Sequence, residues 1–379
     1  MALALDPDGP AAYVYADVLS KHVLAEAHPM QPVRLAYTTA LLRAYGALDD
    51  SGTLVVPPRP ATVEELLTFH EPAYVDAVRR LSGGRDDTAE RFGFVRFGDN
   101  PVYIGMYEAA LASTGASVVA AGLLAEGRVR AAFSPAGGLH HAMPARASGF
   151  CIFNDPVIAI NALRARGLRV AYVDIDAHHG DGVQHAYYAD PDVLTISVHE
   201  GPRWLFPGTG EVAEMGVDAG YGFSVNLPLA PYTTDEAYLR AFDAVVPPLL
   251  ASFKPDVLAT QLGADAYVGD PLTHLALSAH GYEALVTRFA ALGLPWLAFG
   301  GGGYDLDAVP RLWALAYAHM RGLELPDELP PGADAFVRSL HLRDGYADVD
   351  DELTARAEAY AEAQVRELRR RIFPLHGLS

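Results

Sequence analysis

The sequence predicts an α/β fold in which helices cover both faces of a parallel sheet. Short apolar runs rich in β-branched residues alternate with longer helix-like segments, and such runs suit strands buried on both faces. With 379 residues, 51% of them apolar, the chain can bury a large core. Alternating strands and helices imply right-handed crossovers, so we expect helices on both faces of the sheet.

The predicted strands share one feature, which is a polar, turn-rich cluster directly after the apolar run. They cover residues 129–134, 169–173, 193–198, 257–262 and 295–299. The predicted helices cover residues 102–126, 156–166, 235–252 and 350–371, the last of them exposed. Because functional sites of parallel α/β sheets gather at the carboxyl ends of the strands, we expect the polar clusters to form one site.

Charge and cysteine content narrow the function classes. The 28 Lys and Arg against 47 Asp and Glu give a net charge of −19, which argues against a nucleic-acid partner because such proteins neutralise phosphate with basic residues. The one cysteine, Cys151, cannot support a disulfide framework. Residues 1–21 lack the basic start of a signal peptide, and the longest apolar runs, such as residues 118–125, are too short for a membrane span. We therefore expect a cytoplasmic protein without membrane association.

A candidate metal site follows the predicted strand at residues 169–173. Asp174, Asp176 and His178 alternate, so on an extended backbone they project to one side. Burying these groups is costly unless they are paired or bind a metal, and carboxylates with imidazole suit a divalent transition metal. Asp265, after another predicted strand, could supply a third ligand and leave a position open for catalysis. The Asp-x-Asp-x-His pattern by itself also fits a solvated loop of hydrogen-bonded acids.

Two more clusters carry groups suited to proton transfer. His140 and His141 follow two glycines, which leave the backbone free to present both rings to one cleft, where they suit two His–Asp pairs. Tyr304 follows four glycines, and its phenol can donate to a developing oxyanion. The glycine run lacks the spacing of a phosphate-binding loop. Cys151 lies among apolar residues and is expected to be an inert, buried thiol.

Six short motifs, in this order along the chain, resemble the zinc-dependent, class I-like histone deacetylase family, and most of all its bacterial histone deacetylase-like and acetoin-utilisation branch. The motifs are GGLHH, GFCIFND, VDIDAHHGDG, FPGTG, QLGADAYVGDPL and FGGGGY. The resemblance covers roughly residues 10 to 320 of the chain. The resemblance implies the arginase/deacetylase fold, a three-layer α/β/α domain around a largely parallel eight-stranded sheet. It implies one domain over residues 1–379, with the core at about 10–320 and a C-terminal helical extension at 325–379.

The resemblance also implies roles for the residues singled out above. It implies zinc (Zn2+) ligands at Asp176, His178 and Asp265. The catalytic residues that it implies are the pairs His140–Asp174 and His141–Asp181, and Tyr304, which polarises the amide carbonyl together with the metal. Ligation by two aspartates and one histidine would also accept ferrous iron (Fe2+).

A narrow acetyl-lysine channel is implied as well. Its walls are implied at Gly149, Phe150, Phe206 and Leu272. Asp99 matches the rim acid that holds the substrate backbone, and Arg34 resembles the arginine of the internal acetate-exit region. Structural K+ or Na+ sites are implied at two places, one through Ser197 with Asp174 and Asp176, and one at Tyr187, Asp190 and Val193.

The implied activity is removal of acetyl groups from N-ε-acetyl-lysine of acetylated proteins or peptides, with release of acetate. His141 is the expected general base, although the roles of the two histidines stay open. An acetylpolyamine deacetylase is one alternative, which the acidic charge would suit. A binuclear ureohydrolase would need further acids where Gly180 and Tyr267 stand, and a catalytically inactive reader module would need a lost site residue, of which none is missing. The sequence makes no prediction of oligomeric state.

Overall fold

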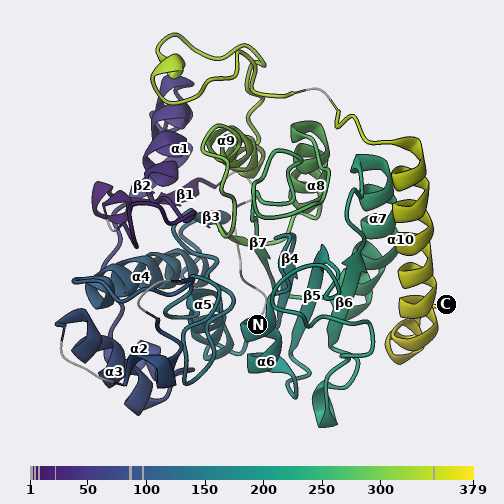
Figure 1. Cartoon of the computed structure of the whole chain (residues 1–379), viewed down its shortest axis with the longest axis horizontal. Helices are drawn as coiled ribbons and strands as arrows, with labels where there is room; N and C mark the ends of the chain where they lie inside the picture. The colour runs from purple at the N-terminus through teal and green to yellow at the C-terminus, as the bar shows by residue number, and fades with distance from the viewer. Residues whose placement is uncertain are drawn as a thin grey trace.

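A single parallel sheet organises the protein (Figure 1). The computed structural model describes residues 3, 6, 9–21, 23–84, 88–95, 98–344 and 346–379. Within them, eight strands form the sheet in the order β2-β1-β3-β8-β7-β4-β5-β6, and every hydrogen-bonded pair is parallel. The strands are β1 Ala11–Val14, β2 Thr53–Val56, β3 Ala131–Ser134, β4 Val170–Asp174, β5 Val193–Glu200, β6 Ser224–Leu229, β7 Val257–Gln261 and β8 Trp296–Phe299.

All five predicted strands are present, as β3, β4, β5, β7 and β8, and each is buried along its whole length. Burial on both faces explains why their sequences are continuous apolar runs without alternation. The sequence did not predict β1, β2 or β6. The first two are only four residues long, and β6 carries Asn226 and Pro228 in its apolar run. Pro228 is tolerated because β6 is an edge strand of the sheet.

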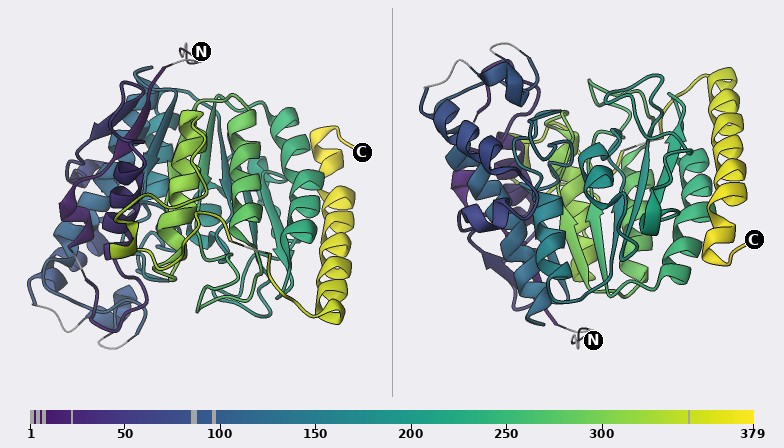
Figure 2. Two further views of the ribbon diagram at one scale, coloured as in Figure 1. Left: turned by 90° about the horizontal axis from the view of Figure 1, so that it is seen from above. Right: turned by 90° about the horizontal axis from the view of Figure 1, so that it is seen from below.

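Helices cover both faces of the sheet and make the predicted three layers (Figures 1 and 2). On one face α1, α9, α8, α7 and α10 pack side by side in that order, and α4, α5 and α6 lie on the other. The helices are α1 Val33–Ala44, α2 Val63–Leu66, α3 Pro72–Ser82, α4 Met106–Ala125, α5 Asp155–Arg164, α6 Asp181–Tyr187, α7 Asp235–Phe253, α8 Ala279–Ala291, α9 Ala308–Arg321 and α10 Asp351–Arg371. The predicted helices correspond to α4, α5, α7 and α10.

Helix α4, Met106–Ala125, lies within the predicted helix at residues 102–126. Its 20 residues make it, in the described part of the chain, the one helix long and apolar enough to cross a membrane by length and composition alone. This corrects the expectation that no apolar segment has that length. The helix packs against α5 and β3, and 61% of its most apolar window is buried inside the protein. Packing in the core therefore accounts for its composition.

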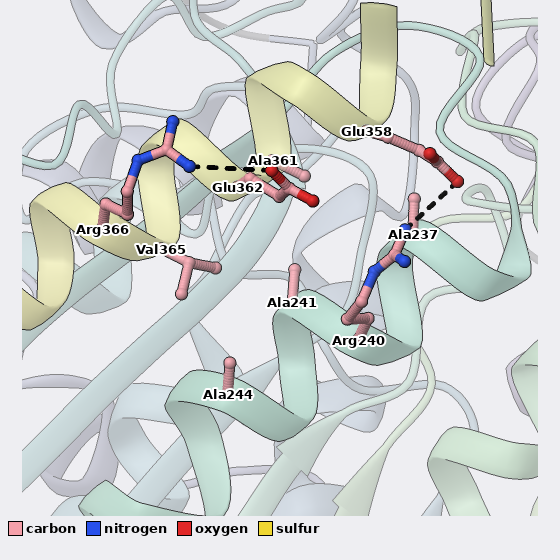
Figure 3. A pocket seen from close by; sticks show the side chains of 9 residues that line it. All are labelled: Ala237, Arg240, Ala241, Ala244, Glu358, Ala361, Glu362, Val365 and Arg366. Atoms are coloured by element: carbon pink, nitrogen blue, oxygen red, sulfur yellow. Dashed lines mark ion pairs between the residues drawn. The ribbon is translucent and has the colours of Figure 1, made fainter. Parts of the chain in front are cut away.

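Helix α10 was predicted to be exposed, but one side of it is buried. Asp350 caps it by accepting hydrogen bonds from the amides of Glu352 and Leu353. The buried residues, Ala357, Ala361 and Leu368, face α7 and β6, which α10 contacts. A cavity of about 170 Å³ lined by alanines separates part of α10 from α7, and an ion pair joins the two helices (Figure 3).

The order of the strands brings the polar clusters together. Strands β3, β8, β7, β4 and β5 are consecutive in the sheet, and all run in the same direction. Their carboxyl ends therefore meet at one edge, where ligand sites of parallel sheets form. The segments that follow four of these strands carry the histidine pair, the Asp-x-Asp-x-His segment, Asp265 and the glycine run before Tyr304.

Candidate active site

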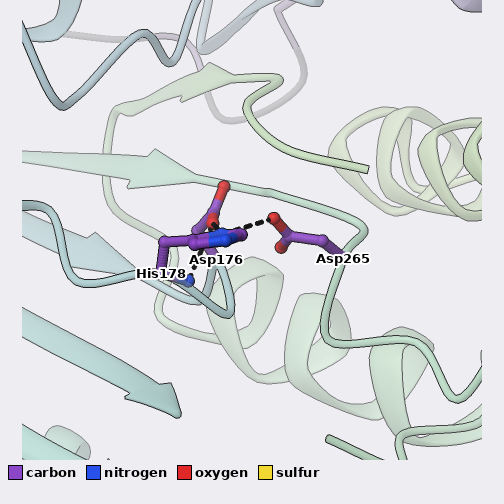
Figure 4. A group of neighbouring side chains, drawn as sticks. All are labelled: Asp176, His178 and Asp265. Atoms are coloured by element: carbon purple, nitrogen blue, oxygen red, sulfur yellow. Dashed lines mark hydrogen bonds and ion pairs between the residues drawn. The ribbon is translucent and has the colours of Figure 1, made fainter. Parts of the chain in front are cut away.

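The three predicted metal ligands lie together at this edge of the sheet. Asp176 and His178 follow β4, and Asp265 follows β7, the strand hydrogen-bonded to β4. All three side chains are buried, and one ligand atom from each lies within 4.8 Å of the others (Figure 4). His178 Nδ1 is 3.0 Å from Asp176 Oδ1 and 3.0 Å from Asp265 Oδ2. The imidazole thus stands between the two carboxylates.

Backbone and amide donors hold the two carboxylates in place. Asp176 Oδ2 accepts hydrogen bonds from the Gln261 side chain at 2.6 Å and from the Gly302 amide at 2.7 Å. Asp265 Oδ1 accepts one from the Ala177 amide at 2.8 Å. Gly302 must be glycine, because an added Cβ would lie 2.0 Å from an Asp265 oxygen and 2.8 Å from Asp176 Oδ2. The donors occupy one oxygen of each carboxylate and leave the other facing His178.

The charges of this group favour a bound cation. Burial and the neighbouring Asp176 raise the pKa of Asp265. Burial lowers the pKa of His178, but hydrogen bonds to both carboxylates outweigh it and raise the pKa to about 10. Two buried carboxylates therefore need positive charge between them, which a proton on His178 or a metal ion can supply. The nitrogen and oxygen donors are those of a divalent transition-metal site, so the residues fit a metal of that class.

The two histidines form the predicted pairs with aspartates. His140 Nδ1 donates to Asp174 Oδ2 at 2.7 Å, and His141 Nδ1 donates to Asp181 Oδ1 at 2.7 Å. The Nε2 atoms of the two rings are 3.0 Å apart, so a single proton is shared between them. Tyr172 also donates to Asp174 Oδ2, at 2.7 Å. Both histidine side chains are buried.

The environments of the two histidines push their pKa values apart. Burial lowers the pKa of His140, but the charges of Asp174 and Asp176 outweigh it and raise the pKa to about 9. Burial and the charge of His140 lower the pKa of His141 to about 4. At neutral pH His140 carries the proton between the two rings, and His141 Nε2 is unprotonated and accepts the hydrogen bond. Two titratable groups separated in this way are suited to different acid and base roles.

Residues from α5 and its cap fix the turn that carries the histidine pair. Asp155 accepts hydrogen bonds from the amides of Gly138 and Leu139, at 3.0 and 2.9 Å. Asn154 donates to the carbonyls of His140 and Ala142, at 3.1 and 3.0 Å. These contacts fix the backbone on both sides of His140.

His70 extends this support away from the site. Its Nε2 accepts a hydrogen bond from the Asn154 amide at 3.0 Å, so the proton is on Nδ1, which points at the carbonyls of Met143 and Pro144. Burial lowers the pKa of His70 to about 4. His70 is therefore a neutral, buried residue that holds the cap of α5.

Tyr304 stands at the end of the glycine run, next to the metal ligands. Its ring lies edge-on to His178, with ring centres 6.5 Å apart. Burial and the charges of Asp265 and Asp176 raise the pKa of Tyr304 well above its usual value, so the phenol stays protonated. The Tyr304 amide donates to Asp270 Oδ2 at 2.8 Å, and Asp270 Oδ1 accepts from the Leu272 amide at 2.9 Å. One carboxylate thus ties Tyr304 to Leu272.

Aromatic residues surround the histidines on the side away from the sheet. The Phe206 ring lies 5.0 Å from the His141 ring, and the Phe150 ring lies 5.7 Å from the Tyr304 ring, both edge-on. A Cβ added at Gly149 would lie 2.4 Å from the His141 ring and 2.9 Å from Phe206. These residues stand close together, as expected for walls of one passage. Phe206 is 42% exposed and reaches the surface.

Asp99 and Arg34 lie at opposite ends of this region. Asp99 is exposed, and its carbonyl accepts a hydrogen bond from His28 Nε2 at 3.2 Å. The His28 ring packs edge-on against Phe150, with ring centres 4.6 Å apart. Arg34 is buried and donates to the carbonyls of Gly303 and Gly301, both at 2.7 Å. It lines a pocket of about 100 Å³ that Phe150 also lines.

The residues of the two predicted cation sites lie from the end of α6 to the start of β5, and around the end of β4 and in β5. Ser197 stands opposite Asp174 in the register of β4 and β5, and its hydroxyl is 2.8 Å from His199 Nδ1. Tyr187 ends α6, Asp190 lies in the connection that follows, and Val193 begins β5. The cation sites at these residues stay predictions. Cys151 is buried, and burial raises the pKa of its thiol well above its usual value.

Sequence reasoning missed several residues that hold the site. Gln261, Asp270 and His28 make hydrogen bonds to site residues, but none of them belongs to a spacing pattern. The sequence could have predicted a role for Gln261, because a polar residue at the end of a buried strand lies at the same edge of the sheet as the predicted metal ligands. His28 and Asp270 lie in loops, where only the folded chain reveals their partners.

Known proteins resemble this chain over most of its length. The histone deacetylase domain family matches residues 28–320. The chain is 40% identical over 330 residues to the acetoin utilization protein AcuC of Bacillus subtilis (strain 168), covering 85% of this chain and 84% of that protein. The AcuC protein of Staphylococcus aureus (strain MSSA476) is 40% identical over 312 residues, covering 80% and 79%. The crystal structure of an HDAC homolog from Aquifex aeolicus matches with a TM-score of 0.84 and 29% identity, over 93% of this chain and 100% of that one. An HDAC homolog complexed with SAHA matches over the same shares, with 29% identity and a TM-score of 0.83.

The buried, neutral state of His70 predicts a pH dependence of stability. Its pKa is about 4 in the folded protein and near 6.5 when unfolded, so the unfolded chain binds more protons between these values. As the pH falls through this window, the wild type should lose about 1.4 kcal/mol of unfolding free energy per pH unit through this group. His70→Gln keeps an acceptor and a donor but does not titrate.

Urea unfolding of both proteins at about pH 7.5 and about pH 5, with a chelator present throughout, isolates this contribution. We expect the wild type to lose more stability than His70→Gln between the two pH values. Equal losses in the two proteins would contradict the account of His70.

Proposed function

The chain belongs to the histone deacetylase family, and from this premise we propose that it is a metal-dependent lysine deacetylase. It hydrolyses the amide of N-ε-acetyl-lysine in an acetylated protein or peptide and releases acetate. The proposal depends above all on two groups of side chains that lie next to each other, the predicted metal ligands and the His–Asp pairs. The Asp176–His178–Asp265 cluster lies beside two His–Asp pairs, under an aromatic wall that reaches the surface.

Asp176, His178 and Asp265 would hold the metal, with Zn2+ expected and Fe2+ also compatible with this donor set. When bound, such an ion supplies Lewis-acid polarisation of an amide carbonyl and makes water more acidic. Gln261 and Gly302 keep one oxygen of Asp176 engaged, so the other stays directed at the cluster. This arrangement supports a site formed before substrate binds.

His141 is the proposed general base. Its pKa, lowered by burial and by His140, leaves Nε2 unprotonated at neutral pH. Its Nδ1–H is held by Asp181, which orients the ring and stabilises the positive charge that forms when Nε2 takes a proton from the attacking water. His140, held by Asp174, supplies positive charge and is the proposed source of the proton for the leaving amine. The shared Nε2 contact lets a proton pass between the two rings.

Tyr304 is the proposed oxyanion donor. Its raised pKa keeps the phenol protonated, so it can donate a hydrogen bond to the carbonyl oxygen as negative charge develops there. Asp270 fixes the backbone at Tyr304, and Arg34 fixes the glycine run before it. The backbone that carries the phenol is therefore held before the reaction begins.

The aromatic rings of Phe206 and Phe150 beside His141 and Tyr304 support a substrate with an acyl group at the end of a long, narrow side chain. Gly149, Phe150, Phe206 and Leu272 are the proposed walls of the channel. Asp99, exposed at the surface end, is proposed to bind the backbone of a peptide substrate.

The net charge of −19 also favours a cationic substrate such as an acetylpolyamine, which is the second candidate. An inactive reader module is disfavoured because every proposed catalytic group is present.

Turnover of two substrates tests the proposal. The purified, metal-loaded protein is assayed side by side with an acetyl-lysine peptide and an acetylpolyamine, and acetate release is measured. We expect a higher kcat/KM for the peptide, because only the peptide has backbone groups for Asp99 to bind. A higher value for the polyamine would support the second candidate, and no acetate from either substrate would overturn the assignment.

Loss of the Tyr304 hydroxyl should remove most turnover. Tyr304→Phe is expected to lower kcat about 100- to 1000-fold, the usual cost of losing one oxyanion donor, without changing metal content. Tyr232→Phe is the matched control, since that ring is 42% exposed. Steady-state kinetics with elemental analysis check both variants. Near-normal turnover by Tyr304→Phe would contradict the oxyanion role.

A further inference from the structure

We propose that the C-terminal helix α10 positions one wall of the substrate channel, with Tyr360 acting through Trp204 on the loop that carries Phe206. The inference rests on the proposed function, because the wall matters only if the channel binds substrate. Tyr360 is a positioning residue in this account. Helix α10 lies beyond residues 28–320, the part that the family domain matches, so the domain itself does not assign it a role.

The loop that carries Phe206 follows β5 and covers residues 201–210. Its two ends are tied to the site edge of the sheet. The Gly201 amide donates to the Leu229 carbonyl at the end of β6, at 2.8 Å. At the other end the Gly210 amide donates to Glu214 at 2.8 Å, and the Gly210 carbonyl lies 3.0 Å from His199 Nε2. These contacts fix the two ends of the loop. The position of its middle part depends on other contacts.

The middle of the loop carries two large aromatic side chains near the surface. Phe206, 42% exposed, packs edge-on against His141 with ring centres 5.0 Å apart. Trp204, 39% exposed, lies two residues earlier and folds over Gly201, where an added Cβ would stand 3.0 Å from its ring. The backbone between the two residues is short, so the position of Trp204 limits where Phe206 can lie.

Tyr360 of α10 contacts this middle part directly. Its ring packs edge-on against Trp204, with ring centres 5.3 Å apart and planes at 75°. Burial and the charge of Glu211 raise the pKa of Tyr360, whereas the charge of Arg203 lowers it. Arg203 precedes Trp204, and Glu211 follows the far end of the loop. Tyr360 is therefore flanked by residues from both arms of the loop that holds Phe206.

The helix that carries Tyr360 is itself anchored to the sheet layer. Glu358, two residues before Tyr360, forms an ion pair with Arg240 of α7 at 3.1 Å (Figure 3). Ala357 and Ala361, on either side, are buried, and α10 also contacts the edge strand β6. The packing of α10 thus fixes the position of Tyr360. Through its contact with Trp204, Tyr360 can restrict the position of the loop.

Kinetics of two Tyr360 variants test the role. Tyr360→Ala removes the ring contact and should raise KM for an acetyl-lysine peptide about 2- to 10-fold, the range of one edge-to-face aromatic contact. The proposed catalytic groups stay in place, so kcat should change by less than about twofold. Tyr360→Phe keeps the ring and should have normal KM. Arg366→Ala, which breaks an exposed ion pair with Glu362 on the same helix, should behave as the wild type.

Fluorescence gives a second readout that does not depend on activity. Of the three tryptophans, Trp296 and Trp313 are only 3% and 0% exposed, so acrylamide quenching reports chiefly on Trp204. Quenching should increase in Tyr360→Ala and stay unchanged in Tyr360→Phe and Arg366→Ala. Thermal unfolding midpoints of all three variants confirm that each is folded.

The outcomes separate this inference from the proposed function. Unchanged KM and quenching in Tyr360→Ala, or a KM increase shared by Tyr360→Phe or Arg366→Ala, would overturn the role of Tyr360. A wild-type protein without deacetylase activity would overturn the proposed function. In that case quenching alone still decides whether α10 holds the loop, and unchanged quenching in Tyr360→Ala would contradict it.

Discussion

The burial of two carboxylates around one imidazole is the constraint on which the rest of the site depends. Asp176 and Asp265 are fully buried, and both direct an oxygen at His178. Such a cluster is costly without compensating positive charge and hydrogen bonds. The parallel order of β4 and β7 brings the carboxylates together, and Gly302 is small enough to donate its amide between them. A metal ion at this point would replace the compensation that the His178 proton provides.

The proposed catalytic groups lie next to that cluster. Asp174 and Asp176 raise the pKa of the neighbouring His140, and burial together with the charge of His140 lowers that of His141. Tyr304 keeps its proton because burial and the same carboxylates oppose its ionisation. One buried group of charges thus gives three neighbouring side chains different protonation states at neutral pH. Division of labour of this kind is what general acid–base catalysis of amide hydrolysis requires.

The residues that the sequence predicted and those that it missed differ in a physical way. Asp176, His178 and Asp265 follow strands that are fully buried and read as continuous apolar runs in the sequence. Strands β1, β2 and β6 are too short or too mixed in composition to be read in this way. His28, Asp270 and Tyr360 act through partners far away along the chain, so only the folded structure reveals them. A sequence pattern predicts where strands end, but it does not show which loop residues or helix residues contact a distant part of the chain.

Metal content measured against a matched pair of variants tests the central claim most directly. Purified wild type, Asp265→Asn and Asp243→Asn are stripped with a chelator, dialysed against Zn2+ and analysed for bound metal. Asp243 is the control because it forms an exposed ion pair with Arg288. The account predicts one tightly bound ion per chain in the wild type and Asp243→Asn, and none in Asp265→Asn. An equal ion content in all three proteins, or none in the wild type, would contradict it.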